Sequence, residues 1–314
     1  MKTIPTFTLL AACCLLLLVS TPAQAQDFMP LRIDGFPGTH LTDPPPVGQA
    51  GENMQIAFYN VSVGGVLPLT RGSTRLLGGL RYENLRVDLL DDDGFVVFTP
   101  DHLHYLRADL FLFQRLSEQW TLGLSFAPGI ASDFEEIGSD DLRLQASALL
   151  LRRANDRLGY GFGASYLSDF GTPLVIPLLK VDYESASHVK FTATLPVNAY
   201  FGFALNPNTE LGLAGNVSGT QYNINLDPDR LPGDIQPVVA PPDDVDLPAK
   251  YSVLTVGPSL KQRVRGPFFV AAEAGLTVWR RFEFDGDQID DTLDQDRSLF
   301  LRFGIAYRPN FKIY

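Results

Sequence analysis

The chain has 314 residues, a formal net charge of −11 and 45% hydrophobic residues. This acidic balance argues against nucleic acid as a partner, because phosphates require a basic surface. Outside the first twenty residues there is no run of eighteen apolar residues, so no transmembrane helix is expected. The 27 glycines, 22 phenylalanines and 11 tyrosines suit many short strands better than helices.

The N-terminus has the organisation of an export signal. Lys2 gives a positive start, residues 9–19 form an apolar core, and Ala23-Gln24-Ala25 is a small-x-small cleavage site. We therefore expect residues 1–25 to be a signal peptide that is cleaved after Ala25. The mature chain then works outside the cytoplasm.

A lipoprotein signal that ends at Cys13 is the alternative interpretation of this leader. The apolar core continues beyond that cysteine to Val19, whereas lipid attachment should end the core. Cys13 and Cys14 are the only cysteines of the sequence, so the mature chain is expected to contain no thiol.

The remainder of the chain divides into an arm and a long region of strands. Residues 26–52 are rich in proline and glycine and show little periodicity, which predicts an irregular N-terminal arm in the periplasm. From residue 53 onward, alternating segments separated by turn residues predict strands. They are expected near 54–67, 74–90, 103–116, 120–132, 141–153, 158–168, 174–184, 188–205, 209–223, 250–264, 268–284 and 298–310.

These segments give twelve strands, and fourteen remain an alternative. Counting back from a final strand that runs towards the periplasm, twelve strands place some short turns on the wrong side. Dividing 188–205 at Leu195-Pro196 restores the alternation of turns and loops but gives thirteen strands. A further N-terminal strand would then be needed.

The two faces of the strands differ in an informative way. In 158–166 the even positions are mostly large and apolar, while the odd positions are glycine or serine. In the last strand, 298–310, the odd positions from Leu299 to Tyr307 are apolar. Bulk outside and small or polar groups inside is the reverse of a soluble barrel. The pattern predicts an all-β, antiparallel, up-and-down transmembrane β-barrel over 53–314, with outer-membrane lipid around it.

The last strand also carries a recognisable end. Arg302, Gly304 and Tyr307 resemble the C-terminal assembly signal of bacterial outer-membrane β-barrels, with Pro309 where a second large apolar residue is usual. The resemblance implies that the barrel assembly machinery is a partner of the chain.

The connections expected between strands alternate in length, and the long ones are acidic. Asp91-Asp92-Asp93 opens one of them, and the last contains Asp287, Asp290, Asp291 and Asp294. Mutual repulsion in a solvated loop explains such a cluster most simply. Binding of divalent cations and adaptation to a salt-rich habitat are the alternatives. If the barrel conducts, these aspartates would attract cations to its mouth.

Ionisable residues alternate with apolar neighbours along several strands, so we expect them to point into the lumen, where charge can meet water or an opposite charge. Two interpretations are left open, a pore lining that selects solutes and a salt-bridged plug that holds a narrow barrel together. The residues are Arg107, Asp109, Arg143, Lys180, Asp182, Lys261, Arg263, Glu273 and Arg302.

Catalysis has little support in the sequence. His102 and His104 would share one face of a strand start, but a pair of exposed loop histidines is the simpler interpretation. No nucleophile with a nearby base, no metal-ligand spacing and no phosphate-binding loop can be recognised. We therefore expect no enzymatic activity, no catalytic residue, no metal and no cofactor.

Over residues 54–314 the layout resembles outer-membrane β-barrel proteins of unknown function that are common in Bacteroidota and their relatives. The resemblance is carried by residues 189–196, 199–204, 211–215 and 221–224. It implies a membrane barrel and brings no catalytic residues. The functions that fit are a passive channel or uptake barrel for a small solute, a structural or adhesive barrel whose outer loops bind cations, glycans or a partner, and, more distantly, a lipid-modifying enzyme.

Overall fold

The computed structural model describes residues 28–40, 55–68, 74–90, 96–98, 102–134, 137–168, 173–226, 245–285 and 290–308. The expected signal peptide and the loops around Asp91 and Asp287 lie outside these ranges. The one helix among the described residues is the short 3-10 helix η1 (Ser139–Asp141), and no described helix is long and apolar enough to cross a membrane.

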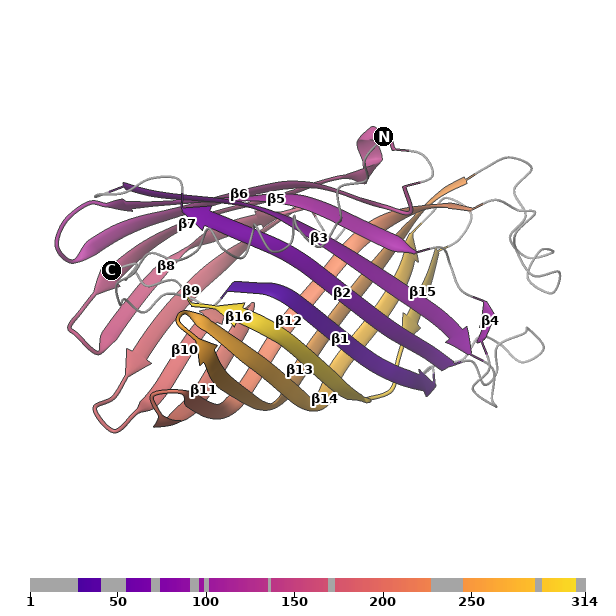
Figure 1. Ribbon diagram of the computed structural model, residues 1–314. Coiled ribbons are helices and arrows are strands. Elements are labelled where there is room, and N and C mark those ends of the chain that lie inside the picture. Colours follow the sequence, from indigo (N-terminus) through magenta and orange to yellow (C-terminus); the bar gives the residue numbers. More distant parts are fainter. Residues whose placement is uncertain are drawn as a thin grey trace, which may run out of the picture.

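The described strands form one antiparallel sheet that closes on itself as a barrel (Figure 1). The sheet has sixteen strands, of which β4 (Val96–Phe98) and β15 (Asp290–Asp294) are side branches on β3 and β14, so fourteen make the ring. The ring consists of β1 (Phe28–His40), β2 (Gln55–Pro68), β3 (Thr74–Leu90), β5 (Leu103–Arg115), β6 (Trp120–Ser132), β7 (Leu142–Arg153), β8 (Leu158–Leu167), β9 (Leu174–Glu184), β10 (Val189–Leu195), β11 (Asn198–Asn206), β12 (Thr209–Leu226), β13 (Val245–Arg265), β14 (Phe268–Asp285) and β16 (Leu299–Tyr307).

The expected fold class, an all-β antiparallel barrel, is confirmed. The ring has fourteen strands, which was the alternative to the expected twelve. The predicted segment 188–205 is divided at Pro196 into β10 and β11, joined by a two-residue turn. The further N-terminal strand is β1, which pairs with β16 on one side and β2 on the other. In Figure 1 the indigo β1 runs beside the yellow β16, where the ring closes.

The expectation of an irregular arm over residues 26–52 is wrong for Phe28–His40, which form β1. Proline lacks the N–H that a strand ladder needs, so two prolines argued against a strand here. Both prolines lie at irregularities of the ladder. Pro30 falls in the register shift between Phe28 and Leu31, and Pro37 in the shift between Phe36 and Thr39.

The two faces of the wall follow the predicted alternation. In β16 the odd positions from Leu299 to Ile305 are exposed, with Leu299 and Leu301 about two-thirds exposed at 66% and 64%, while the even positions Phe300, Arg302, Gly304 and Ala306 are buried. A side-chain period of two therefore divides an apolar outer face from an inner face. β6 and β8 show the same division, with Phe126 and Phe162 exposed on the outside.

Because the strands of the ring run up and down, the connections fall at two ends. The turns at 116–119, 154–157, 185–188, 207–208 and 266–267 share one end, which we call the short-turn end. The opposite, long-connection end carries β4 and β15 (Figure 1). The two-residue β10–β11 turn is an exception, because it lies on the side of the long connections.

Candidate functional site

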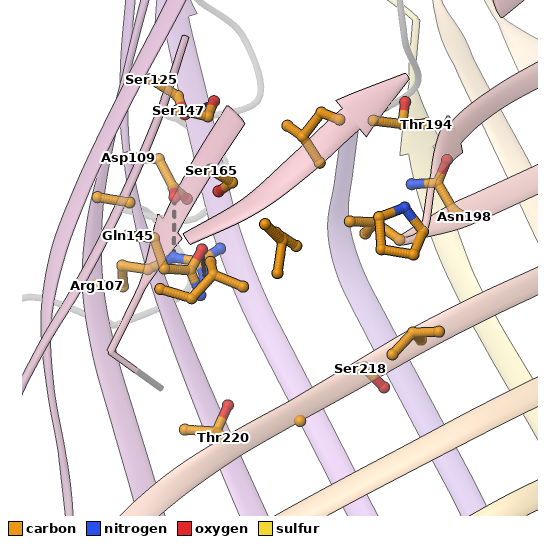
Figure 2. Close-up of a pocket in the computed structure, with 18 of the residues that line it drawn as sticks. Arg107, Asp109, Ser125, Gln145, Ser147, Ser165, Thr194, Asn198, Ser218 and Thr220 are labelled. Atoms are coloured by element: carbon orange, nitrogen blue, oxygen red, sulfur yellow. Dashed lines mark hydrogen bonds and ion pairs between the residues drawn. The ribbon is translucent and has the colours of Figure 1, made fainter. Parts of the chain in front are cut away.

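The barrel encloses a cavity of about 550 Å³. Part of its wall is apolar, with Phe111 and Phe113 of β5, Leu149 of β7 and Leu178 of β9. Hydroxyl and amide groups face the same space from other strands. They are Ser125, Ser147, Ser165, Thr194, Asn198, Ser218 and Thr220, which Figure 2 shows around a common space.

Several polar groups of the cavity wall are held by their neighbours. The hydroxyls of Ser125 and Ser147 lie 2.6 Å apart on adjacent strands, and Ser165 donates to the carbonyl of Ala146. Arg107 donates to the amide oxygen of Gln145 at 3.3 Å. The result is a mixed surface, with fixed hydrogen-bonding groups between large apolar side chains.

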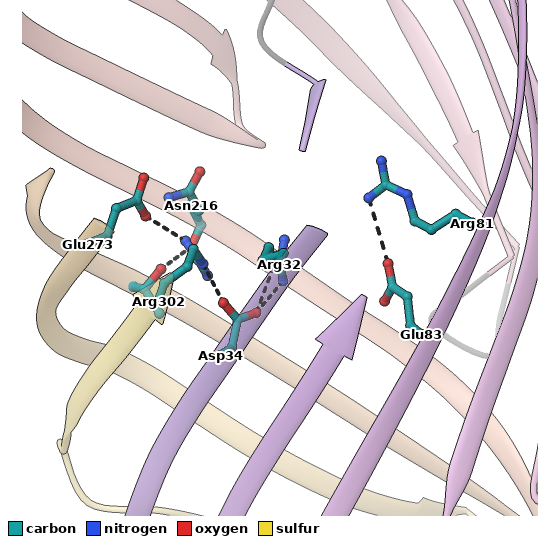
Figure 3. Close-up of polar contacts among 8 residues, drawn as sticks. Arg32, Asp34, Arg81, Glu83, Asn216, Glu273 and Arg302 are labelled. Atoms are coloured by element: carbon teal, nitrogen blue, oxygen red, sulfur yellow. Dashed lines mark hydrogen bonds and ion pairs between the residues drawn. The ribbon is translucent and has the colours of Figure 1, made fainter. Parts of the chain in front are cut away.

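A chain of ion pairs crosses the inner face from β14 to β1 (Figure 3). The Nη1 of Arg302 lies 2.8 Å from Glu273 Oε2, and its Nε lies 2.6 Å from Asp34 Oδ1. The other oxygen of Asp34 is 2.6 Å from Arg32 Nη2. Three neighbouring strands, β14, β16 and β1, are thus joined by side chains as well as by backbone hydrogen bonds.

Further pairs continue around the lumen. Arg81 lies 3.7 Å from Glu83 and 3.6 Å from Asp109, while Arg107 lies 2.9 Å from Asp109. On the other wall, Lys180 lies 3.4 Å from Asp182. These charges compensate one another, because a charge away from bulk water is costly unless it is paired. An ionic solute would have to compete with these existing pairs.

Aromatic and aliphatic side chains close the lumen towards the long-connection end. Phe36 of β1 stacks on Phe300 of β16 at 6.2 Å and meets Tyr251 of β13 edge-on at 6.4 Å. These three residues belong to one buried cluster that also draws on β3, β5, β6, β12 and β14. It contains Phe36, Leu85, Leu103, Tyr105, Ala131, Tyr222, Ile224, Ala249, Tyr251, Val253, Phe282 and Phe300.

Strands from opposite sides of the ring meet beside this cluster. Ser132 of β6 pairs with Asn223 of β12, and the N–H of Asp133 donates to the Asn223 carbonyl at 3.2 Å. Arg143 of β7 is buried there, and its Nε donates to the carbonyl of Gln221 at 2.8 Å. The strands β7 to β11, which lie between β6 and β12 in the ring, are shorter than β12. Towards the long-connection end, beyond these strands, β6 and β12 meet directly and the ring is narrower. We call this contact the β6–β12 junction.

A second group narrows the lumen at the short-turn end. Arg308, just after β16, makes a two-pronged contact with Glu210 of β12, at 2.6 and 3.1 Å. Lys190 of β10 lies 4.0 Å from the same carboxylate. The Arg308 guanidinium also lies 4.5 Å from the Phe269 ring centroid. The cavity thus lies between an apolar closure and a charged constriction.

A family model described as "Domain of unknown function (DUF6268)" matches residues 81–313. The chain belongs to this family. The match begins within β3, so that β1 and β2, which complete the ring of this DUF6268 protein, precede it. Among curated proteins, none matches the sequence.

Three solved structures are similar to the DUF6268 chain at low identity. A bacterial polysaccharide outer membrane secretin is 12% identical, with a TM-score of 0.34 over 89% of this chain and 97% of that one. A TodX monoaromatic hydrocarbon channel deltaS2 mutant is 11% identical, with a TM-score of 0.37 over 92% and 91%. The beta domain of the Bordetella autotransporter BrkA is 10% identical, with a TM-score of 0.28 over 88% and 97%.

The residues expected to line the lumen of the DUF6268 barrel fall into different surroundings. Arg107, Asp109 and Lys180 contribute to the cavity wall, whereas Asp182 pairs with Lys180 without lining it. Glu273 and Arg302 belong to the ion-pair chain, and Arg143 to the β6–β12 junction.

The remaining charged residues of that set lie nearer the short-turn end. The Nζ of Lys261 lies 4.7 Å from the ring centroid of Tyr200, and the guanidinium of Arg263 lies 5.1 Å from that of Phe269. Arg263 is exposed.

The other sequence-based sites are only partly described. Gly304 is buried in β16, and Tyr307 packs against Phe268 of β14 at 5.4 Å; recognition by the assembly machinery stays a prediction. Asp290, Asp291 and Asp294 lie in β15, but their side chains and all of Asp287 are outside the described residues. In the described part of the chain, no three His, Cys, Asp or Glu residues are placed to hold a metal ion.

His102 and His104 lie close together at the start of β5, with ring centroids 6.3 Å apart. The Nδ1 of His104 is 2.6 Å from the hydroxyl of Tyr82, and its ring stacks on Phe134 at 5.1 Å. His104 thus packs against aromatic neighbours at the long-connection end.

Sequence reasoning missed the serines and threonines of the cavity wall and the aromatic cluster. Small hydroxyl residues on an inner face give no signal of their own, because they also occur on the inner face of a barrel without a binding site. Phe36, Phe282 and Phe300 are large side chains on the inner face, where the strand pattern otherwise places small or polar residues. This departure from the pattern was the sequence feature that could have indicated the aromatic cluster.

Proposed function

We propose that this protein is an outer-membrane β-barrel that takes up a small, neutral, amphipathic solute into the cavity of its lumen. The observation that carries the proposal is the 550 Å³ cavity itself, with its mixed apolar and hydroxyl lining. Binding sites for small molecules are concave, mostly apolar and contain a few fixed polar groups. The affiliation with Bacteroidota, the cleaved leader and cation binding at the outer loops rest on the sequence alone.

The apolar outer face supports a membrane location. Large side chains such as Leu80, Phe126, Phe162 and Leu301 are 47–67% exposed around the ring. Leaving such surface in water costs about 25 cal/mol per Å². An apolar band around a closed sheet, with charge inside, is the arrangement of a barrel in lipid.

The closures at the two ends favour an uptake barrel with a binding cavity over an open diffusion pore. A continuous water-filled path is opposed by the aromatic cluster at the long-connection end and by the Glu210–Arg308 contact at the other. The paired charges of the lumen also favour a neutral solute, because a free ion would have to compete with the ion pairs that the described residues already make.

A structural or adhesive barrel is the second candidate. The ion-pair chain through Arg302 and the cluster around Phe36 fill the lumen in the way a purely structural interior would. In a structural or adhesive barrel the cavity has no role in transport. Substitutions in the cavity wall should then leave the uptake of a solute by the cells unchanged.

The test is uptake of N-phenyl-1-naphthylamine, a neutral amphipathic dye that fluoresces on reaching lipid, by Gram-negative cells expressing the protein. Ser147→Trp fills the cavity, and Ala148→Trp, the next residue on β7, adds the same side chain to the exposed outer face. We expect faster uptake with the wild type and Ala148→Trp than with Ser147→Trp, at equal amounts of folded barrel. Uptake at the level of cells without the protein in all three cases would reject the proposal.

A further inference from the structure

The strands β10 and β11 are much shorter than the strands that follow them in the barrel wall. β10 has 7 residues and β11 has 9, whereas β12 has 18 and β13 has 21. A strand needs about 9–11 residues to cross a membrane. β10 is shorter than this and β11 only reaches the lower limit. If the barrel lies in a membrane, the β10–β11 turn therefore lies at or inside the edge of the apolar layer, and the longer neighbouring strands continue beyond it.

The sequence of this turn agrees with an apolar setting. It reads Leu195-Pro196-Val197, all three exposed, whereas the turns at 117–119 and 206–208 are polar. Turns that face water are generally polar. A wholly apolar turn at the top of a short hairpin is suited to contact with lipid.

Above the hairpin, β9 has an edge without a strand partner in the described part of the chain. β9 pairs with β10 from Glu184 to Leu179 and continues to Leu174 beyond the end of β10. The N–H of Glu184 points towards β8, so the odd residues of β9 direct their backbone groups to the β10 side. Pro177 is one of these residues. It has no N–H to leave unpaired, which is why proline suits an edge.

The facing edge belongs to β12. Its pairing with β11 ends at Asn216, and Val217 still donates to the Val197 carbonyl. The next contact on that side is Asn223 with Ser132, and the Gln221 carbonyl between them accepts from Arg143. Gly219 directs its backbone groups to the same side by the alternation of the strand. Within the described residues, no strand pairs with it there.

The cavity extends to this gap in the wall. Its lining includes Ile176 and Leu178 on β9, Val197 on the turn, and Ser218 and Gly219 on β12. Figure 2 shows Thr194 and Asn198, which flank the β10–β11 turn, and Ser218 and Thr220 of the neighbouring β12 around the same space. The outer rim is apolar and exposed, and consists of Val175, Leu179, Leu195, Val197 and Val217.

We infer that this gap, bounded by β9, the β10–β11 turn and β12, is a lateral window through which an apolar or amphipathic solute passes between the cavity and the surrounding lipid. This inference rests on the proposed function, and it specifies the route by which the solute reaches the cavity. Backbone that lacks a partner at membrane depth is tolerated only where it is buried or lines a cavity. Gly219 lines the cavity, and Pro177 has no N–H to leave unpaired.

The test uses a cysteine in the cavity, Ser147→Cys, in the full chain with Cys13 and Cys14 changed to Ser, refolded into lipid vesicles. N-phenylmaleimide, neutral and soluble in lipid, probes the lateral route. A charged methanethiosulfonate probes the axial water route. Modification is followed by intact mass. Gly219→Trp adds bulk at the window rim, because position 219 has the same outward parity as exposed Leu213.

Gly215→Trp is the matched control, because Gly215 lies four residues before Gly219 on β12 and has the same outward parity. Gly215 pairs with Ala199 and Val256, and the nearest atoms to an added Cβ lie at ordinary contact distance, 3.7 Å or more. We expect Gly219→Trp to slow N-phenylmaleimide severalfold and Gly215→Trp to leave it unchanged. The charged reagent should react slowly in both variants, because the lumen is closed at both ends. Equal modification of the two proteins after unfolding in urea shows that the cysteine remains reactive.

Val197→Trp, on the turn that bounds the window, is a second variant that is expected to slow N-phenylmaleimide as Gly219→Trp does. It replaces Gly219→Trp in the test if the Gly219→Trp protein folds poorly. Equal rates with N-phenylmaleimide in the Gly219→Trp, Val197→Trp and Gly215→Trp proteins overturn the window. If dye uptake by cells still depends on Ser147, the proposed function stands without the lateral route. If neither experiment responds, both are rejected.

Discussion

The guanidinium of Arg302 on the last strand lies 2.6 Å from the carboxylate of Asp34 on the first. The closure of the ring is thus reinforced by a buried ion pair, which Glu273 and Arg32 extend on either side. Because both partners are almost fully removed from water, losing one leaves the other uncompensated. The point where the chain ends meet is therefore sensitive to single substitutions.

Arg302→Leu should lower the free energy of unfolding in vesicles by about 3–5 kcal/mol, the usual cost of breaking a buried pair from one side. Arg153→Leu is the matched control, because its partner Asp156 is 89% exposed on a turn. Its effect should stay within about 1 kcal/mol. Urea titration followed by tryptophan fluorescence measures both. Similar costs for the two variants would show that the Arg302 pair is not a stabilising closure.

Leu301→Arg tests the assignment of the outer face. Leu301 is exposed on the outside of β16, and an arginine at mid-membrane costs about 2–4 kcal/mol. Leu116→Arg is the control, since that exposed leucine lies at the short-turn end, where the cost falls to about 0–1 kcal/mol. The measurement is the yield of heat-modifiable folded barrel on a gel. Equal yields would place Leu301 away from lipid.

Arg143→Met should loosen the β6–β12 junction. It removes the donor to the Gln221 carbonyl and to the Asn223 side chain, next to the hydrogen bond from Asp133 N–H to Asn223. Amide exchange of Asp133 should then become severalfold faster. Arg152→Met, which removes a half-buried arginine over Trp120 at the other end of β7, should not change it. Unchanged exchange in both variants would mean that Arg143 does not hold the junction.

The sequence allowed the barrel, its faces and the alternation of its turns to be predicted, because each depends on neighbours along one strand. The period of two in β16 and the glycine-rich inner face of β8 are local patterns of this kind. β1 was missed because Pro30 and Pro37 conceal its alternation, although both lie at irregularities of the ladder.

The candidate site could not be predicted in the same way. The cavity and its closure depend on which inner residues of distant strands face one another, such as Phe36 with Tyr251 and Ser132 with Asn223. Inner-facing charges were recognised from alternation, but their partners depend on the register between strands. Arg143 illustrates this, since it was expected among lumen-lining charges and instead holds β12.

Ion conductance of the refolded protein in a planar bilayer tests most directly whether the lumen is closed at both ends. With the aromatic cluster at one end and the Glu210–Arg308 contact at the other, the wild type should carry no sustained stepwise current. Removing two rings of the cluster, Phe36→Ala with Tyr251→Ala, should allow stepwise currents to appear. Stable, large conductance steps in the wild type would contradict the closed lumen and restore the open passive channel.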